Sequence, residues 1–252
     1  QRPLKLKYLP IRVNELNVHL MGSFIFCTSF FNSEAQYRER YLRWIDYYSG
    51  IELSKDKPLV IIDDGSPDLS FVGSEASVWK VEAGFPDQLD KVNIFTFPNN
   101  LGRVSHLGYW GWWRSFLFSF EIAKNYNLEK IIHIESDCFL LTEKATSALE
   151  DFKDGWMSFW TDKYRFPETN IQVITKSEFS HLDNLEEMVR REKRKTFGST
   201  VHAEHLLPFT KVDKDMVGDR YGEENLPLSS GMDYYCQTPP EIRVTPEVFN
   251  QL

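Results

Sequence analysis

Two carboxylates at positions 135 and 137 are the strongest chemical signal in the sequence. Glu135 and Asp137 follow Ile131, Ile132 and Ile134, a β-branched run typical of a strand that is covered on both faces. If the strand continues, both carboxylates point to the same side, because side-chain direction alternates along a strand. Magnesium or manganese is commonly held by one or two carboxylates together with substrate phosphates. The spacing therefore predicts a metal site, with an ordinary polar strand end as the alternative.

A second acidic pair follows another apolar run. Asp63 and Asp64 come directly after the run at residues 59–62, and Gly65 and Ser66 then allow a sharp turn. Carboxylates in this position can accept hydrogen bonds from a base, from ribose hydroxyls or from a metal-bound water. A simple Asp-Gly turn is the alternative, because such turns are common.

Other candidate residues are basic or titratable. Arg103 follows a glycine-containing turn and precedes a predicted helix, which suits a diphosphate as well as it suits a surface arginine. Histidines are possible third metal ligands: His133, His181, His202 and His205. His133 lies within the apolar strand, so a hydrogen-bonded core histidine is the favoured interpretation there.

The elements that would position these residues alternate between strands and helices. Strands are predicted at residues 24–30, 59–62, 92–98, 130–138, 155–166 and 170–179. Helices are predicted at 34–48, 104–126, 142–152 and 182–195, with a weak helix at 75–81, a short helix capped by Ser199 or Thr200, and mostly loop after it. Asn32-Ser33 is the expected cap of the first helix, which Gly50 ends, and Thr142 is the expected cap of the third. This order favours an α/β fold with a largely parallel sheet. Ligands of such sheets bind beyond the carboxyl ends of the strands, where Thr28, Ser29 and Phe30 would join the acidic pairs.

Composition excludes several classes of protein. A net charge of −8 over 252 residues argues against a nucleic-acid backbone as the partner. No apolar run approaches the roughly 20 residues of a membrane span, and no basic-then-apolar leader follows Gln1. Three distant cysteines, Cys27, Cys138 and Cys236, favour reduced core thiols and a cytoplasmic setting.

Four ordered segments resemble a known family. FCTSFFNSEAQYRERYLRW, VIIDDGSPD, FPNNLGR and IIHIESDC are similar to successive landmarks of GT-A fold glycosyltransferases, especially the family-2-like group. The resemblance covers about residues 23–160. It implies a Rossmann-like nucleotide-binding fold in one domain, 1–252, with a nucleotide-sugar-binding half at about 21–160. The loop-rich acceptor half, about 161–252, matches no landmark, and further domains of a longer protein are left open.

The resemblance also implies roles for individual residues. Thr28, Ser29, Phe30 and Asn32 would border the nucleotide, and Asp63 and Asp64 would recognise its base or ribose. Glu135 and Asp137 stand at the Asp-x-Asp positions that bind Mn²⁺ or Mg²⁺ on the donor diphosphate. Asp137 is the safer ligand, because Glu135 is longer than the usual aspartate. The family's Ala-Arg-Asn segment is absent, and Arg103 lies closer to the turn.

The implied activity is transfer of a sugar, a hexose in the expected class, from a nucleotide-diphosphate donor to an acceptor hydroxyl. A UDP-sugar is the favoured donor, and the acceptor is a glycan, a lipid-linked saccharide or a glycoprotein. An inverting enzyme would need a base, for which Glu204 is favoured over Glu223, Glu224 and Asp233. The alternatives are a non-catalytic carbohydrate- or nucleotide-binding module and a nucleotidyltransferase, although the glycine-rich loop typical of the latter is missing after the first strand.

Overall fold

The computed structural model describes residues 22–103, 108–195, 203–220 and 231–241, without the side chains of residues 190–195, 204 and 205. Its main feature is an eight-stranded sheet in the order β3-β4-β2-β1-β5-β8-β7-β9. Five adjacent strands run parallel. They are β3 (Ser77–Lys80), β4 (Val92–Thr96), β2 (Leu59–Asp63), β1 (Ser23–Ser29) and β5 (Lys130–Ile134). The predicted α/β fold with a mostly parallel sheet is confirmed.

The other edge of the sheet is mixed. β8 (Phe166–Thr175) runs antiparallel to β5, β7 (Trp156–Thr161) runs antiparallel to β8, and β9 (Lys211–Asp213) runs parallel to β7. The first strand, β1, lies in the middle, with β2 on one side and β5 on the other. The chain order therefore reverses at β1, and ligands of open α/β sheets bind at such a reversal.

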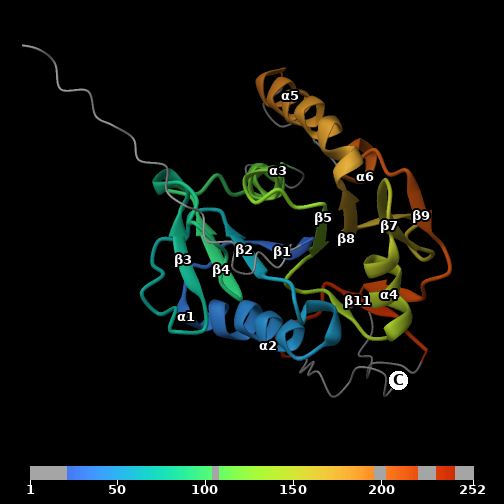
Figure 1. Ribbon diagram of the computed structural model, residues 1–252, viewed down its shortest axis with the longest axis horizontal. Coiled ribbons are helices and arrows are strands. Elements are labelled where there is room, and N and C mark those ends of the chain that lie inside the picture. Colours follow the sequence, from blue (N-terminus) through green and yellow to red (C-terminus); the bar gives the residue numbers. More distant parts are fainter. Residues whose placement is uncertain (1–21, 104–107, 196–202, 221–230, 242–252) are drawn as a thin grey trace, which may run out of the picture.

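Helices cover both faces of the sheet (Figure 1). One face carries α1 (Glu34–Gln36), a π-helical segment (Tyr37–Leu42), α2 (Arg43–Ser49) and α4 (Glu143–Asp151), whereas α3 (Trp110–Asn125) and α5 (Phe179–Lys195) cover the other. Along β1, Ile25 and Cys27 join the first core, and Phe24 and Phe26 join the second. This alternation is what a strand covered on both faces requires.

The predicted helix caps are confirmed where the structure describes them. The Ser33 hydroxyl accepts a hydrogen bond from Gln36 N at 3.3 Å, and the helical stretch ends at Gly50. The Thr142 hydroxyl accepts from Ala145 N at 3.2 Å. Ser199 and Thr200 lie outside the described residues, and α6 (Ala203–Leu206) is the part of the predicted short helix that is described.

Several predicted elements are wrong. The weak helix at 75–81 is instead strand β3 followed by a 3-10 turn (Val81–Ala83), because Val78 and Trp79 pair with Ile94 and Phe95 of β4. The strand predicted to run through residue 138 ends at Ile134. The strand predicted at 155–166 ends at Thr161 and turns back into β8.

The segment predicted as mostly loop contains strands as well. A small sheet of order β10-β11-β6 joins β10 (Gly218–Arg220), β11 (Tyr234–Cys236) and β6 (Phe139–Leu140). Tyr234 and Tyr235 are fully buried in it. Three-residue strands have too little periodicity to be recognised, and tertiary pairing decides their conformation.

The three cysteines are buried and free, which confirms their predicted place in the core. Among the helices that the structure describes, none combines the length and the apolar character needed to cross a membrane.

Candidate functional site

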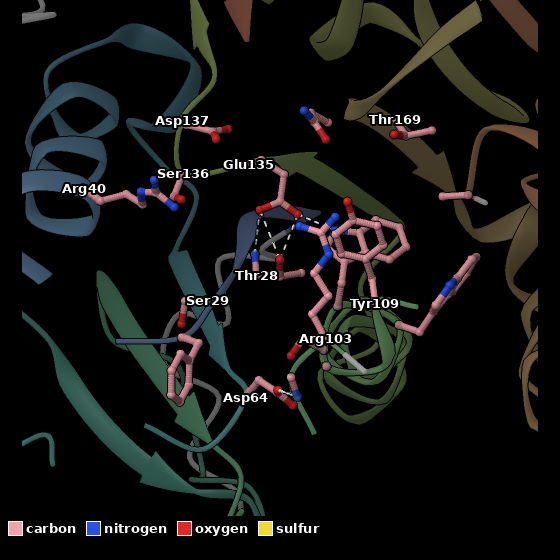
Figure 2. Close-up of a pocket in the computed structure, with 18 of the residues that line it drawn as sticks. Thr28, Ser29, Arg40, Asp64, Arg103, Tyr109, Glu135, Ser136, Asp137 and Thr169 are labelled. Carbon is pink, nitrogen blue, oxygen red and sulfur yellow. Dashed lines mark hydrogen bonds between the residues drawn. The ribbon is translucent and has the colours of Figure 1, made fainter. Parts of the chain in front are cut away.

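A cleft of about 700 Å³ lies beyond the carboxyl ends of the central strands. The end of β1 contributes Thr28, Ser29 and Phe30, and the turn after β5 contributes Glu135, Ser136 and Asp137 (Figure 2). Arg40 comes from the helical stretch after β1, whereas Arg103, Tyr109 and Trp112 come from the turn after β4 and the start of α3. The second half of the chain contributes Thr169, Asn170, Arg220 and Gln237. Asn32, expected to border a nucleotide, is not among the described residues that line the cleft.

The Glu135 carboxylate is occupied by protein donors. Thr28 Oγ1 donates to it at 2.9 Å, Trp112 Nε1 at 2.6 Å and His133 Nε2 contacts it at 2.8 Å. Burial raises the pKa of Glu135, but the attraction of His133 and these hydrogen bonds outweigh burial and leave the pKa below its usual value. Glu135 therefore joins β1, β5 and α3, and it keeps its charge without help from a ligand.

The Asp137 carboxylate, in contrast to that of Glu135, is not held by strong protein donors. Among the described residues, its carboxylate has one hydrogen-bond partner, the Cys138 thiol at 3.7 Å. Burial, followed by the negative charge of Glu135, raises its pKa to about 6. A half-buried carboxylate that lines a cleft with so weak a protein donor is available for a ligand.

The two acids do not share a strand, contrary to the prediction. Residues 135–138 form a turn in which Cys138 N donates to Glu135 O at 2.9 Å. The Glu135 carboxylate points toward Thr28, whereas the Asp137 carboxylate lies apart from it, on the side of Ser136 and Arg40 (Figure 2). The side chains diverge because a turn does not keep the two-residue repeat of a strand.

Asp63 is fully buried and does not line the cleft. It accepts hydrogen bonds from Ser66 N at 2.9 Å and from Thr96 Oγ1 at 2.6 Å. Burial raises its pKa despite these donors. Its carboxylate thus stabilises the turn after β2, where protein donors occupy its oxygens.

Asp64 lines the cleft and holds the turn that follows β4. Its Oδ2 accepts hydrogen bonds from Asn100 Nδ2 at 2.9 Å and Gly102 N at 2.8 Å, and Arg114 pairs with its Oδ1. A Cβ at Gly65, where φ is +83°, would collide with the backbone of Asn99. The glycine is therefore needed for the close approach of the two turns.

The basic residues of the cleft come from two sides. Arg103 is exposed and stacks on the ring of Tyr109, with its guanidinium carbon 4.6 Å from the ring centroid. Arg40 lies on the opposite side, next to Ser136 (Figure 2). Arg220 also lines the cleft, but it forms a bidentate pair with Glu168 at 2.9 Å for both contacts.

The candidates for a catalytic base differ in where they lie relative to the cleft. Asp233 is buried and accepts from Thr142 Oγ1 at 2.8 Å and Lys144 Nζ at 2.9 Å, and it does not line the cleft. It is therefore a structural residue, since its carboxylate joins α4 to the small sheet. Glu223 and Glu224 lie outside the described residues. Glu204 belongs to α6, whose first residue, Ala203, lines the cleft, but its side chain is not described.

The histidines supply no third metal ligand within the described part of the chain. His133 is fully buried and stacks on Phe26, with the ring centroids 4.6 Å apart, which confirms the core interpretation. His181 pairs with Glu178 away from the cleft. His202 lies outside the described residues, and the side chain of His205 is not described.

Three residues of the site were missed by sequence reasoning. Trp112 and Arg114 belong to α3, which is mostly apolar and aromatic and was therefore expected to pack in the core. Their contacts to Glu135 and Asp64 were not predicted. Arg40 lies in the helix predicted at 34–48, which also carries Arg38 and Arg43, so the sequence does not distinguish it from them. A search for polar atoms on otherwise apolar helices could have found the first two.

The described residues of the cleft offer a divalent metal ion one available carboxylate. No group of three or more His, Cys, Asp or Glu side chains in the described ranges is arranged to hold one. Magnesium, however, commonly binds through one or two carboxylates plus substrate phosphates. Asp137 has the free oxygens for this role, whereas Glu135 is occupied.

Comparisons with known proteins give similarity at the level of structure. No protein-family model matches the sequence, and no curated protein matches it. The structure is similar to that of a glycosyltransferase involved in the glycosylation of the major capsid of PBCV-1, with a TM-score of 0.48, 9% sequence identity, and coverage of 85% of this chain and 92% of that chain. It is also similar to S. aureus TarS 1-349, with a TM-score of 0.42, 12% identity, and coverage of 86% of this chain and 60% of that one. These similarities concern the fold, and the reaction must be argued from the site.

Proposed function

We propose that this protein is a metal-dependent glycosyltransferase that moves a sugar, a hexose in the expected class, from a nucleotide-diphosphate donor to an acceptor hydroxyl. The observation that carries the proposal is Asp137, a half-buried carboxylate at the cleft where the strand order reverses, to which only a thiol donates among the described residues. The ordered landmarks of the sequence support the same reaction. The buried free thiols suit a cytoplasmic location.

The donor would lie along the ends of β1 and β5. Thr28 and Ser29 border this part of the cleft, and Phe30, 38% exposed, offers a ring face for a base. A UDP-sugar is the favoured donor. Asp64 would act on it indirectly, by holding the loop that carries Arg103.

The charged groups of the cleft fit a diphosphate. Asp137 would hold Mn²⁺ or Mg²⁺, and such an ion neutralises charge on a leaving diphosphate. Arg103 would contact a phosphate, since guanidinium groups bind phosphate oxygens through paired hydrogen bonds. Glu135 would position Thr28 and Trp112 rather than bind the ion, because its oxygens accept from both.

The acceptor would enter from the second half of the chain, where Thr169, Asn170 and Gln237 line the cleft. A glycan, a lipid-linked saccharide or a glycoprotein would present its hydroxyl there. If the configuration is inverted, Glu204 is the proposed base, because α6 begins at the cleft wall.

One observation favours a second function, a non-catalytic nucleotide- or carbohydrate-binding module. The protein itself satisfies Glu135 at one of the two Asp-x-Asp positions, so a single carboxylate remains for a metal. A module of this kind would bind a nucleotide or a sugar without turnover.

The test is thermal unfolding with a panel of nucleoside diphosphates and their sugars, each with Mn²⁺ and again with chelator. A ligand at 100 times its dissociation constant adds about 2.7 kcal/mol of stability. For this chain length the unfolding midpoint should rise by roughly 5–10 °C. A metal-dependent shift with one nucleotide, followed by turnover of its sugar, supports the transferase. A shift without turnover of any offered sugar supports the module, and no shift with any nucleotide contradicts both nucleotide-binding functions.

A further inference from the structure

The helical stretch after β1 contains an irregular turn beside the cleft. Tyr37–Leu42 is π-helical, between the α-helical residues of α1 and α2. Such turns are rare and occur often at functional sites, because the wider turn redirects the side chains that it carries. Two residues of this segment, Arg40 and Tyr41, line the cleft.

The segment is fixed to the end of β1. The Tyr41 hydroxyl accepts from Phe30 N at 3.3 Å and lies 3.4 Å from Phe30 O. The rings of Tyr37 and Tyr41 pack edge-on against Phe31, with centroid distances of 5.3 and 4.3 Å. The backbone that carries Arg40 is therefore anchored on both sides, and the position of Arg40 is set by the fold.

Arg40 differs from the neighbouring arginines. Arg38 pairs with Glu34 at 2.8 Å, and Arg43 donates to Pro239 O at 2.8 Å. Arg40 is exposed, and its side chain makes no hydrogen bond or ion pair to the described residues. Its positive charge nevertheless reaches Asp137, whose pKa it lowers against the effect of burial.

The cleft has a guanidinium group on each side of Glu135. Figure 2 shows Arg40 next to Ser136 on one side and Arg103 with Tyr109 on the other. Asp137 lies on the Arg40 side of this arrangement. An anion that extends across the cleft toward Asp137 would pass within reach of Arg40, whose guanidinium forms no hydrogen bond or ion pair with the residues that the structure describes.

We propose that Arg40 is a binding residue for the diphosphate of the donor. The inference rests on the proposed function and adds a contact on the wall opposite Arg103. An unpaired guanidinium on an anchored turn suits phosphate because its planar donors match two phosphate oxygens at once. If Arg40 binds phosphate, the Asp137 side of the cleft holds the diphosphate of the donor rather than the acceptor.

The test measures binding of inorganic pyrophosphate and of UDP by calorimetry, with chelator and with Mn²⁺, to the wild type and to Arg40→Ala. We expect Arg40→Ala to weaken both ligands at least tenfold in either condition and to leave the unfolding midpoint unchanged. Arg40→Lys should recover part of the affinity, because it keeps the charge but not the paired donors. Arg38→Ala, on the same helical stretch but paired with Glu34, should bind both ligands as the wild type does.

Several outcomes would overturn the inference. If Arg40→Ala binds pyrophosphate and UDP like the wild type, Arg40 does not contact the diphosphate, and the proposed function still stands. If glucuronate binds in an Arg40-dependent way and pyrophosphate does not, the arginine serves an anionic sugar instead. If the wild type binds neither pyrophosphate nor any nucleoside diphosphate, both the inference and the proposed function are wrong.

Discussion

Two turns at the same edge of the sheet carry two acids each and use them differently. In the turn after β2, protein donors occupy both Asp63 and Asp64. In the turn after β5, donors occupy Glu135, but within the described part of the chain Asp137 accepts a hydrogen bond only from the Cys138 thiol. The comparison shows that an acid at the end of a strand is available for a ligand only where the protein leaves its oxygens unsatisfied.

Burial alone does not separate the two classes of acid. It raises the pKa of Asp63 as well as that of Asp137, which reaches about 6. Glu135 is buried as well, and yet its pKa is lowered because His133, Thr28 and Trp112 interact with it. The supply of hydrogen-bond donors therefore distinguishes the acids that hold the fold from the one that can hold a ligand.

The largest expected effect on stability comes from an occupied acid, through Asp64→Ala. The change removes the partner of half-buried Arg114 and the acceptor for Asn100 and Gly102. Breaking such a buried pair costs about 3–5 kcal/mol. Urea unfolding should show this loss, whereas Asp162→Ala at an exposed position should stay within about 0.5 kcal/mol of the wild type. Equal stability of the two variants would mean that Asp64 does not hold the turns together.

A smaller effect is expected from Trp112→Phe, which keeps an aromatic ring but removes the donor to Glu135 at 2.6 Å. A hydrogen bond to a charged group contributes about 1.5–3 kcal/mol, so chemical unfolding should show a loss of this size. Trp79→Phe is a matched control, because Trp79 Nε1 donates to a neutral partner, Asn93 Oδ1, at 3.0 Å. A larger loss from the control than from Trp112→Phe would contradict the assignment of Glu135 as an anchored charge.

The smallest expected effect depends on pH and extends the comparison to Asp233. Burial raises the pKa of Asp233, but its hydrogen bonds from Val217 N, Lys144 and Thr142 outweigh burial and lower the pKa. Its contribution is therefore present above the unfolded pKa of about 3.9 and is lost as the pH falls through the lower folded value. Asp233→Asn should cost about 1 kcal/mol at pH 7.

Thermal unfolding of the wild type and of Asp233→Asn between pH 2 and pH 7 checks this prediction. The two midpoints should converge as the pH falls below about 4. A difference that stays constant over the whole range would show that the charge of Asp233 does not stabilise the fold.

The sequence predicted the central parallel strands and the helices that cap on Ser33 and Thr142, because long apolar runs and side-chain caps are local signals. It did not predict β3 or β11, which are short strands formed by pairing with distant partners. Thr28, Ser29, Phe30, Asp64, Arg103, Glu135 and Asp137 were expected at one site, and all of them line one cleft.

The sequence could not show which acids of that site accept hydrogen bonds from the protein and which one is available for a ligand. The partners of Glu135 include Thr28 and Trp112, 107 and 23 residues away along the chain. Asp63 was expected to face a ligand, but Thr96 and Ser66 turn its carboxylate inward. Which acid is occupied depends on donors that only the folded chain brings together.

The central claim is that Asp137 is the available acid, and calorimetric titration of Mn²⁺ with UDP tests it most directly. Asp137→Asn should weaken metal-dependent UDP binding at least 100-fold, which corresponds to about 2.7 kcal/mol. Asp63→Asn, which changes an occupied acid at the same sheet edge, should keep metal-dependent binding. If Asp137→Asn binds Mn²⁺ and UDP as the wild type does, or if both variants lose binding equally, the account of the site is wrong.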